Sequence, residues 1–60
     1  MKPYFVMLDL PNGDITPLTD EDGVIAMFEF QLDAMKAGFN NRLGEELGFE
    51  IFESGNGLYY

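Results

Sequence analysis

The sequence predicts an α+β domain, in which a small antiparallel sheet of about three strands carries one main helix on one face. Sixty residues leave room for a single small acidic domain, residues 1–60, and 47% of them are hydrophobic, enough for a folded core. Short aromatic and β-branched runs near both ends indicate strands, and the longest apolar stretch between them contains helical spacing. The expected order of elements is β-(β)-β-α-β, with a short strand in the bracketed position.

The first strand is expected at residues 4–8, a run of aromatic and β-branched residues that ends at a Pro-Asn-Gly turn, residues 11–13. A short extended piece follows at residues 15–18. Because Pro17 has no backbone N–H, this piece belongs at the edge of the sheet.

Residues 24–39 allow two structures. As one helix, apolar residues recur at spacings of three and four and form a stripe made of Val24, Phe28, Leu32, Met35 and Phe39. As a strand followed by a helix, the apolar run opens a buried strand at residues 24–29, and the helix covers residues 31–37. The second interpretation is preferred, because a single helix would be apolar on every side.

A short helical segment is expected at residues 42–47, ended by Gly48, and a final strand at residues 49–53. Residues 54–60 are expected to form a flexible tail that begins with a Ser-Gly-Asn-Gly loop. Tyrosine is favoured at interfaces, so the apolar end of the tail is a candidate contact with a second copy or a partner, through Leu58, Tyr59 and Tyr60. A frayed terminus explains these residues equally well.

The composition excludes several classes of function. The chain has 11 acidic and 3 basic residues, a net charge of −8 and a pI near 4.1, which argues against direct contact with nucleic acid or with an anionic membrane surface. It has no Cys and no His, so it lacks thiol nucleophiles, thiolate zinc ligands and the commonest general base. No catalytic or cofactor motif is present, and we expect no enzyme activity, no metal and no cofactor.

The segment at residues 18–29 nearly matches a calcium-binding EF loop. With Gly23 at the sixth position, acids fall on several ligand positions, but Leu18 stands where the first carboxylate is required. Proline and glycine upstream also prevent the helix that precedes such a loop. The sequence therefore favours an acidic turn over a calcium site.

Negative charge is concentrated in residues 14–33, which hold six acids and no basic residue. Such a surface resembles the field of a nucleic-acid backbone and would be steered onto a basic groove. The candidate contact residues are Asp20, Glu21, Asp22, Asp33, Glu45 and Glu46. For Glu45 and Glu46, the sequence favours an ordinary helix surface on which Arg42 reaches Glu46, and the contact role is the alternative.

The segments PLTDEDG (17–23), IAMF (25–28), LG (43–44) and GFEIF (48–52), together with Ala34 and Ala37, form a pattern of spacing and composition across residues 17–53. This pattern resembles small acidic proteins of phages and other mobile elements, among them anti-CRISPR proteins directed at type I systems, several of which act as DNA mimics. Phe30 departs from it, because a polar helix cap is usual there. The resemblance implies an inhibitor that occupies the DNA-binding surface of a CRISPR surveillance complex.

The sequence thus predicts a non-enzymatic inhibitor, monomeric or homodimeric, that binds a basic nucleic-acid-binding protein of a bacterial host. No secretion signal or membrane span is indicated, so we expect it in the cytoplasm of an infected or element-carrying cell. The alternative is a small phage or plasmid structural or assembly protein that acts as a homodimer and whose acids serve only solubility.

Overall fold

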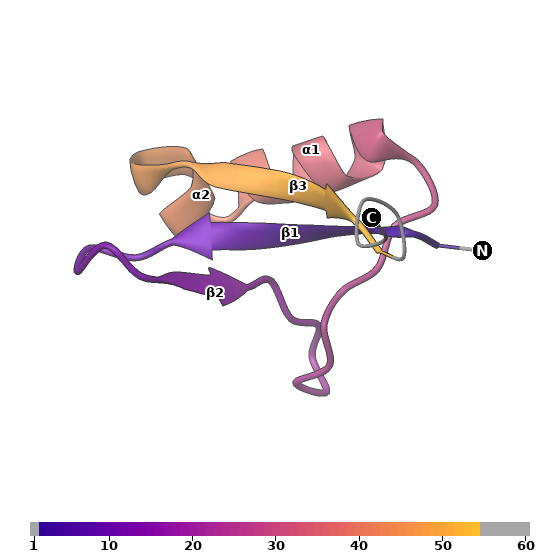
Figure 1. Ribbon diagram of the computed structural model, residues 1–60, viewed down its shortest axis with the longest axis horizontal. Helices are drawn as coiled ribbons and strands as arrows, with labels where there is room; N and C mark the ends of the chain where they lie inside the picture. Colours follow the sequence, from indigo (N-terminus) through magenta and orange to yellow (C-terminus); the bar gives the residue numbers. More distant parts are fainter. Residues whose placement is uncertain (1, 55–60) are drawn as a thin grey trace, which may run out of the picture.

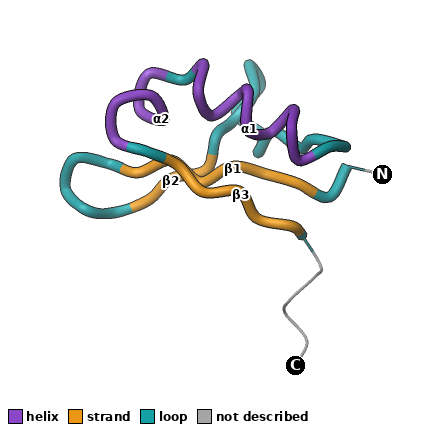
Figure 2. Tube along the Cα trace, turned by 90° about the horizontal axis from the view of Figure 1, so that it is seen from above, coloured by secondary structure: helices purple, strands orange, loops and turns teal. Residues whose placement is uncertain are grey.

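A three-stranded antiparallel sheet with two helices on one face makes up the computed structural model, which describes residues 2–54 (Figure 1). The central strand β1 (Tyr4–Asp9) lies between β2 (Ile15–Pro17) and β3 (Phe49–Glu53). The helices α1 (Gln31–Asn40) and α2 (Arg42–Leu47) lie on the same side of the sheet (Figure 2). This arrangement confirms the predicted α+β class, and β2 is an edge strand, as Pro17 predicts.

The core lies between β1 and the helices. Val6 and Leu8 are almost completely buried, and Ala34 of α1 completes the centre of the core. Side chains alternate along a strand, so Phe5 and Met7 lie on the opposite face of the sheet. Partly buried residues surround the core on the helix side: Tyr4, Leu18, Phe28, Leu43, Phe49 and Ile51. Within the described residues, the helices cover only this one face.

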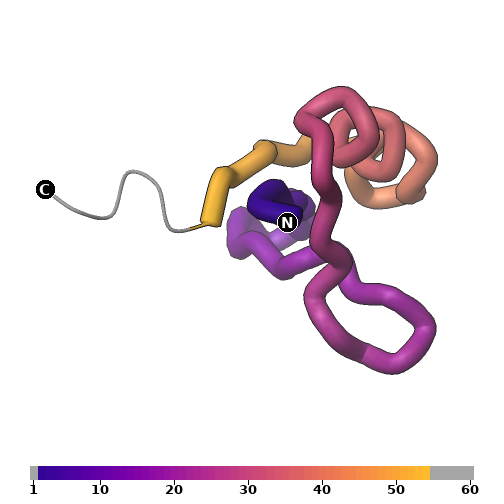
Figure 3. Tube along the Cα trace, turned by 90° about the vertical axis from the view of Figure 1, so that its right-hand side faces the viewer, coloured from indigo at the N-terminus to yellow at the C-terminus, as the bar shows by residue number. Residues whose placement is uncertain are grey.

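The edge of β1 opposite β3 is lined by a discontinuous strand. Leu18 extends the β2 pairing, because its N–H donates to the Val6 carbonyl at 2.9 Å. The next pairing on this edge comes from Phe28, which exchanges two backbone hydrogen bonds of 2.7 and 3.0 Å with Tyr4. The intervening chain projects away from the sheet (Figure 3). Its residues 19–25 are termed the acidic loop.

Residues 24–30 form neither the start of one long helix nor a buried strand. The helix begins at Gln31, as the strand-then-helix interpretation predicts. The segment before it joins the sheet through the single bridge at Phe28, while Val24 and Ile25 are 60% and 42% exposed. The reason is competition for one edge, because β2 and Leu18 already pair with most of β1 there.

The helix α1 packs through its smallest residues. Ala34 is fully buried, and Gly38 lies beneath the Phe49 ring. The large apolar residues Leu32, Met35 and Phe39 point away from the core and are 59%, 38% and 58% exposed. Spacing alone predicts an apolar stripe on this helix, but close packing selects the side with small residues, which lets the helix approach the sheet.

The C-terminal elements begin and end where the sequence predicts. The helix α2 ends at Gly48, whose φ of 105° is accessible to glycine, and β3 follows directly. The expected contacts of Leu58, Tyr59 and Tyr60 lie outside the described residues and stay predictions. Between residues 2 and 54 the structure has no helix with the length and apolar character needed to cross a membrane.

Candidate functional site

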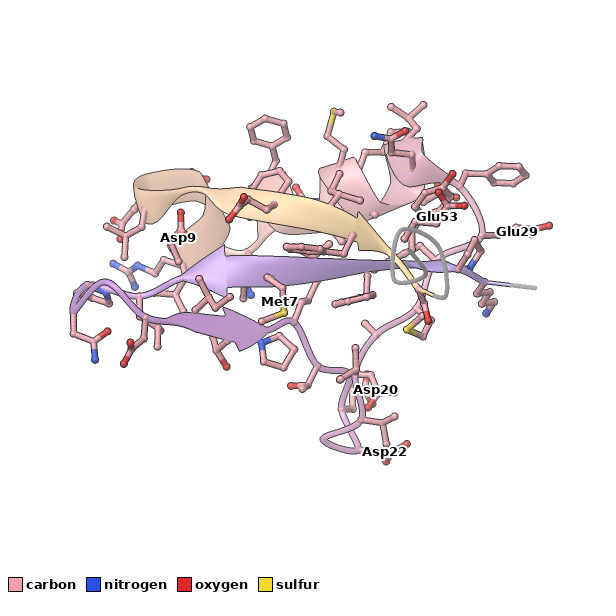
Figure 4. The ribbon with its side chains drawn as sticks, viewed as in Figure 1. Met7, Asp9, Asp20, Asp22, Glu29 and Glu53 are labelled. Atoms are coloured by element: carbon pink, nitrogen blue, oxygen red, sulfur yellow. The ribbon has the colours of Figure 1, made fainter. Side chains whose placement is uncertain are left out.

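Asp20 fixes the shape of the acidic loop. Its Oδ1 accepts hydrogen bonds from the N–H groups of Asp22 and Val24 at 2.9 and 3.1 Å. Its backbone also pairs with Val24 (2.8 Å) and with Gly23 (3.1 Å), which has a φ of 82°. Asp20 therefore organises the loop, which also carries the exposed Glu21 and Asp22. Figure 4 shows Asp22 near the tip of the loop.

The same geometry accounts for the near-match to a calcium loop. An Asp-x-Asp-Gly sequence forms this turn through side-chain to backbone bonds and needs no ion to close it. In the described part of the chain, no three acidic side chains gather as a set of metal ligands. Residues 20–24 therefore form a turn held by these bonds, and the expectation that they bind no calcium stays a prediction.

Several segments bring acids to the end of the sheet at which β1 begins. Tyr4, the first residue of β1, pairs with Glu53 on one side and with Phe28 on the other, which places Glu29 at this end. The first turn of α1, with Asp33, starts here too. Figure 4 shows Glu29 and Glu53 at this end and Asp9 at the opposite one.

The acids of the stretch 14–33 that lie on the acidic loop or at this end of the sheet are together termed the acidic end: Asp20, Glu21, Asp22, Glu29 and Asp33. All five residues are exposed. The acidic loop belongs to it because the loop leaves and rejoins the sheet beside the first half of β1, at Leu18 and Phe28.

Four of the six predicted contact acids belong to the acidic end, and two do not. Glu45 and Glu46 are exposed on α2, which leads to Gly48. The Gly48 carbonyl accepts a hydrogen bond from the N–H of Asp9 at 3.1 Å, so α2 ends beside the last residue of β1. The two glutamates therefore lie at the opposite end of the sheet and form a separate surface.

Glu29 is the member of the acidic end that the sequence did not single out as a contact residue. It follows the apolar run 24–28 directly, and its position is set by the bridge between Phe28 and Tyr4. That bridge joins residues 24 positions apart, so no local pattern reveals it. The signal present in the sequence was only its membership of the uncompensated stretch 14–33.

The face of the sheet that the helices leave uncovered has a shallow apolar hollow of about 320 Å³. Phe5, Met7, Ile15 and Phe52 line it, and the Phe5 and Phe52 rings stack with centroids 5.6 Å apart. All four lining residues are apolar, and a catalytic pocket needs a few convergent polar groups. The hollow therefore offers contact area but no acid–base chemistry.

A second apolar surface follows α1 beside β3. It consists of Leu32, Met35 and Phe39 and is termed the apolar ridge. The Phe39 ring meets the Phe49 ring of β3 edge-on, with centroids 5.1 Å apart, so the ridge adjoins the β3 strand. Large exposed apolar groups that adjoin one another mark interaction surfaces.

Comparisons of this chain with protein-family models, with curated proteins and with solved structures find no match. Its function is therefore inferred from its own residues.

Proposed function

We propose that this chain is a non-enzymatic inhibitor whose acidic end binds a cationic, nucleic-acid-binding site of a host protein in place of the nucleic acid. The observation that carries the proposal is that five exposed acids, from a stretch without any lysine or arginine, lie on the acidic loop and at the end of the sheet where β1 begins. Such a surface is attracted to basic grooves and competes there with phosphate groups.

The hydrogen bonds that hold the backbone of the acidic end support this role. Asp20 holds the loop that carries Glu21 and Asp22, and the bridge at Phe28 and the start of α1 position Glu29 and Asp33. Charges held in place before binding lose less conformational freedom when the complex forms. The acidic end thus carries its carboxylates on a backbone whose position is set before binding.

In its most specific form, the proposal is an anti-CRISPR protein that blocks DNA binding by a type I CRISPR surveillance complex. The resemblance of residues 17–53 to small acidic mobile-element proteins supports this choice of target. Inhibition would require no cofactor and no chemical step, because occupation of the DNA-binding surface is sufficient.

Charge reversal at the acidic end tests the proposal. The triple variant Glu21→Lys, Asp22→Lys, Glu29→Lys is expected to lose inhibition of duplex binding by a purified type I complex, measured by gel shift with labelled DNA. It leaves Asp20 intact, because reversal of Asp20 would also remove the acceptor that holds the loop.

The matched control reverses three acids elsewhere: Asp14→Lys, Glu45→Lys and Glu46→Lys. It changes net charge by the same amount and should retain inhibition, because α2 lies at the other end of the sheet from the acidic end. Equal loss in both variants would mean that net charge alone is responsible and would contradict the assignment of the acidic end. A wild-type chain that leaves DNA binding unchanged rejects the anti-CRISPR form.

A second candidate function is a small homodimeric structural or assembly protein whose acids serve solubility. The apolar ridge and the uncovered apolar face favour it, since both expose large apolar residues. If the protein has this second function, the triple charge-reversal variant should retain the structural or assembly function, because the acids then serve only solubility. Deletion of residues 57–60 tests whether the C-terminal tyrosines contribute to a homodimer. Light scattering measures the molecular mass before and after the deletion.

A further inference from the structure

The apolar hollow lies on the face of the sheet that the described helices leave uncovered. Phe5 and Met7 alternate along β1 with the buried Val6 and Leu8, so they point to this face. The Phe5 ring stacks on that of Phe52, with an angle of 20° between the two planes. Adjoining apolar groups that are open to solvent mark a contact surface, and the hollow therefore indicates an occupant.

The chain leaves the sheet beside this hollow. The Ser54 N–H donates to the Pro3 carbonyl at 2.6 Å, so the end of β3 is held against the start of β1. Phe52 precedes Ser54 by two residues and pairs with Phe5 in the β1–β3 ladder. Two residues of a strand correspond to about 7 Å. The stacked rings therefore lie close to the point from which residues 55–60, which are outside the described part, continue the chain.

The remaining segment is long enough to return across the hollow. Three steps of the chain, from Ser54 to Gly57, can span about 10 Å, which is the usual distance between packed sheet layers. The next three steps, from Gly57 to Tyr60, can then run back over about 10 Å. This distance exceeds the separation of about 7 Å between Ser54 and the pair formed by Phe5 and Phe52.

We infer that residues 58–60 fold back over the hollow of the same chain and cover it. The Gly-Asn-Gly sequence at residues 55–57 is typical of a reversal of direction. Leu58, Tyr59 and Tyr60 supply large apolar groups and no charged side chain, which matches a lining made only of apolar residues. A tyrosine covers apolar surface with its ring and can keep its hydroxyl group in water.

The chain's own segment is a better occupant than a second copy. The short connection through residues 55–57 makes the contact intramolecular, which corresponds to an effective concentration on the order of millimolar. Two separate copies each carry a net charge of −8 and repel each other. The inference goes beyond the proposed function and does not depend on it, because the hollow uses none of the residues of the acidic end.

Nuclear magnetic resonance of the full chain with labelled methionine methyl groups tests the inference. Met7 lines the hollow, and Met35 on the apolar ridge serves as an internal reference. Nuclear Overhauser contacts between the Met7 methyl group and the ring of Tyr59 or Tyr60 are expected, with the same intensity over a dilution series. The variant Leu58→Ser, Tyr59→Ser, Tyr60→Ser keeps the chain length. It should lose these contacts and shift the Met7 signal, through loss of ring currents, without shifting that of Met35.

Proteolysis tests the contact from the side of the hollow. Chymotrypsin cleaves after aromatic residues and leucine, and a covered segment is cleaved more slowly than a released one. Phe52→Lys places a charge in the hollow and should speed cleavage within residues 58–60 several-fold, as measured by mass spectrometry. The matched control Phe30→Lys makes the same change at a ring that is 60% exposed outside the hollow, and should leave the rate unchanged.

Four results would overturn the inference. The first is a Met7 signal that is the same in the wild-type chain and in the serine variant. The second is a set of contacts that weaken on dilution and join labelled to unlabelled chains, which would make a second copy the occupant. The third is equal cleavage of the wild-type chain and the Phe52→Lys variant. The fourth is a dimer that becomes monomeric on deletion of residues 57–60, which would assign the tyrosines to a homodimer.

Discussion

At the scale of single residues, two glycines set how closely the helices approach each other and the sheet. A β-carbon on Gly38 would lie 2.5 Å from the Phe49 ring, and one on Gly44 would strike the carbonyl oxygen of Gly38. Neither glycine has a positive φ, so space rather than backbone freedom requires glycine here. The close approach leaves no room for a large side chain on this side of α1 and helps to explain why the apolar ridge faces outward.

The change Gly38→Ala is expected to lower the free energy of unfolding by roughly 1–2 kcal/mol, because overpacking outweighs the gain in helix propensity. Gly44→Ala is expected to lower the free energy of unfolding by more, because a backbone carbonyl cannot rotate aside as a ring can. Urea denaturation at one fixed protein concentration measures both, with Lys36→Ala at an exposed site of α1 as the control. A stabilised Gly44→Ala variant would contradict the close helix contact.

At the scale of elements, α1 and α2 differ in how they begin. Asn41 caps α2, because its side-chain oxygen accepts a hydrogen bond from the N–H of Leu43 at 2.9 Å. Phe30 occupies the equivalent position of α1 with an extended backbone and makes no side-chain cap. The ring is 60% exposed, so little apolar burial is lost if a polar residue replaces it.

Phe30→Ser is therefore expected to raise the free energy of unfolding by about 0.5–1 kcal/mol, and Asn41→Ala to lower it by about 1 kcal/mol. Phe30→Ala serves as the control, because it removes the ring without providing an acceptor. Thermal denaturation followed by circular dichroism compares the variants. If Phe30→Ser were no more stable than Phe30→Ala, the serine would not be capping α1.

The elements that the sequence predicts correctly are those with local signals. Gly48 ends α2 and the run 49–53 has strand composition, so both boundaries agree with the structure. The run 24–28 has equally strong strand composition, but its pairing depends on whether β1 has an edge available, and β2 occupies most of that edge. Competition between distant segments for the same strand edge cannot be predicted from the local sequence.

In the candidate site too, the features encoded by local sequence could be predicted, and those set by strand pairing could not. The shape of the acidic loop follows from its own Asp-x-Asp-Gly sequence, and its acids are recognisable from charge alone. The addition of Glu29 and the separation of Glu45 and Glu46 follow from how β1 pairs with its neighbours. Closeness in sequence is therefore a guide to the site only within one loop or helix.

At the scale of the whole molecule, the acidic loop and the apolar ridge lie on different sides of β1. The acidic loop projects away from the sheet on the β2 side (Figure 3). The apolar ridge adjoins β3 through the contact between Phe39 and Phe49. A net charge of −8 is confined to a domain of 30 × 25 × 22 Å, so mutual repulsion opposes the folded state. This repulsion is long-ranged at low salt, because the screening length is about 30 Å at ~0.01 M and about 8 Å at ~0.15 M.

Raising the NaCl concentration over this range is therefore expected to increase the free energy of unfolding by roughly 1 kcal/mol, or about 4–8 °C in Tm for a domain of this size. The variant Glu21→Gln, Asp22→Asn, Glu29→Gln removes three charges from the acidic end without altering side-chain size, and should show a smaller response to salt. Scanning calorimetry at two protein concentrations separates the effect of charge screening within one chain from the effect of dimerisation. Screening within the monomer is independent of protein concentration, whereas stabilisation by dimerisation is not. A Tm that stays constant or falls with salt at both concentrations would show that the acids do not oppose folding.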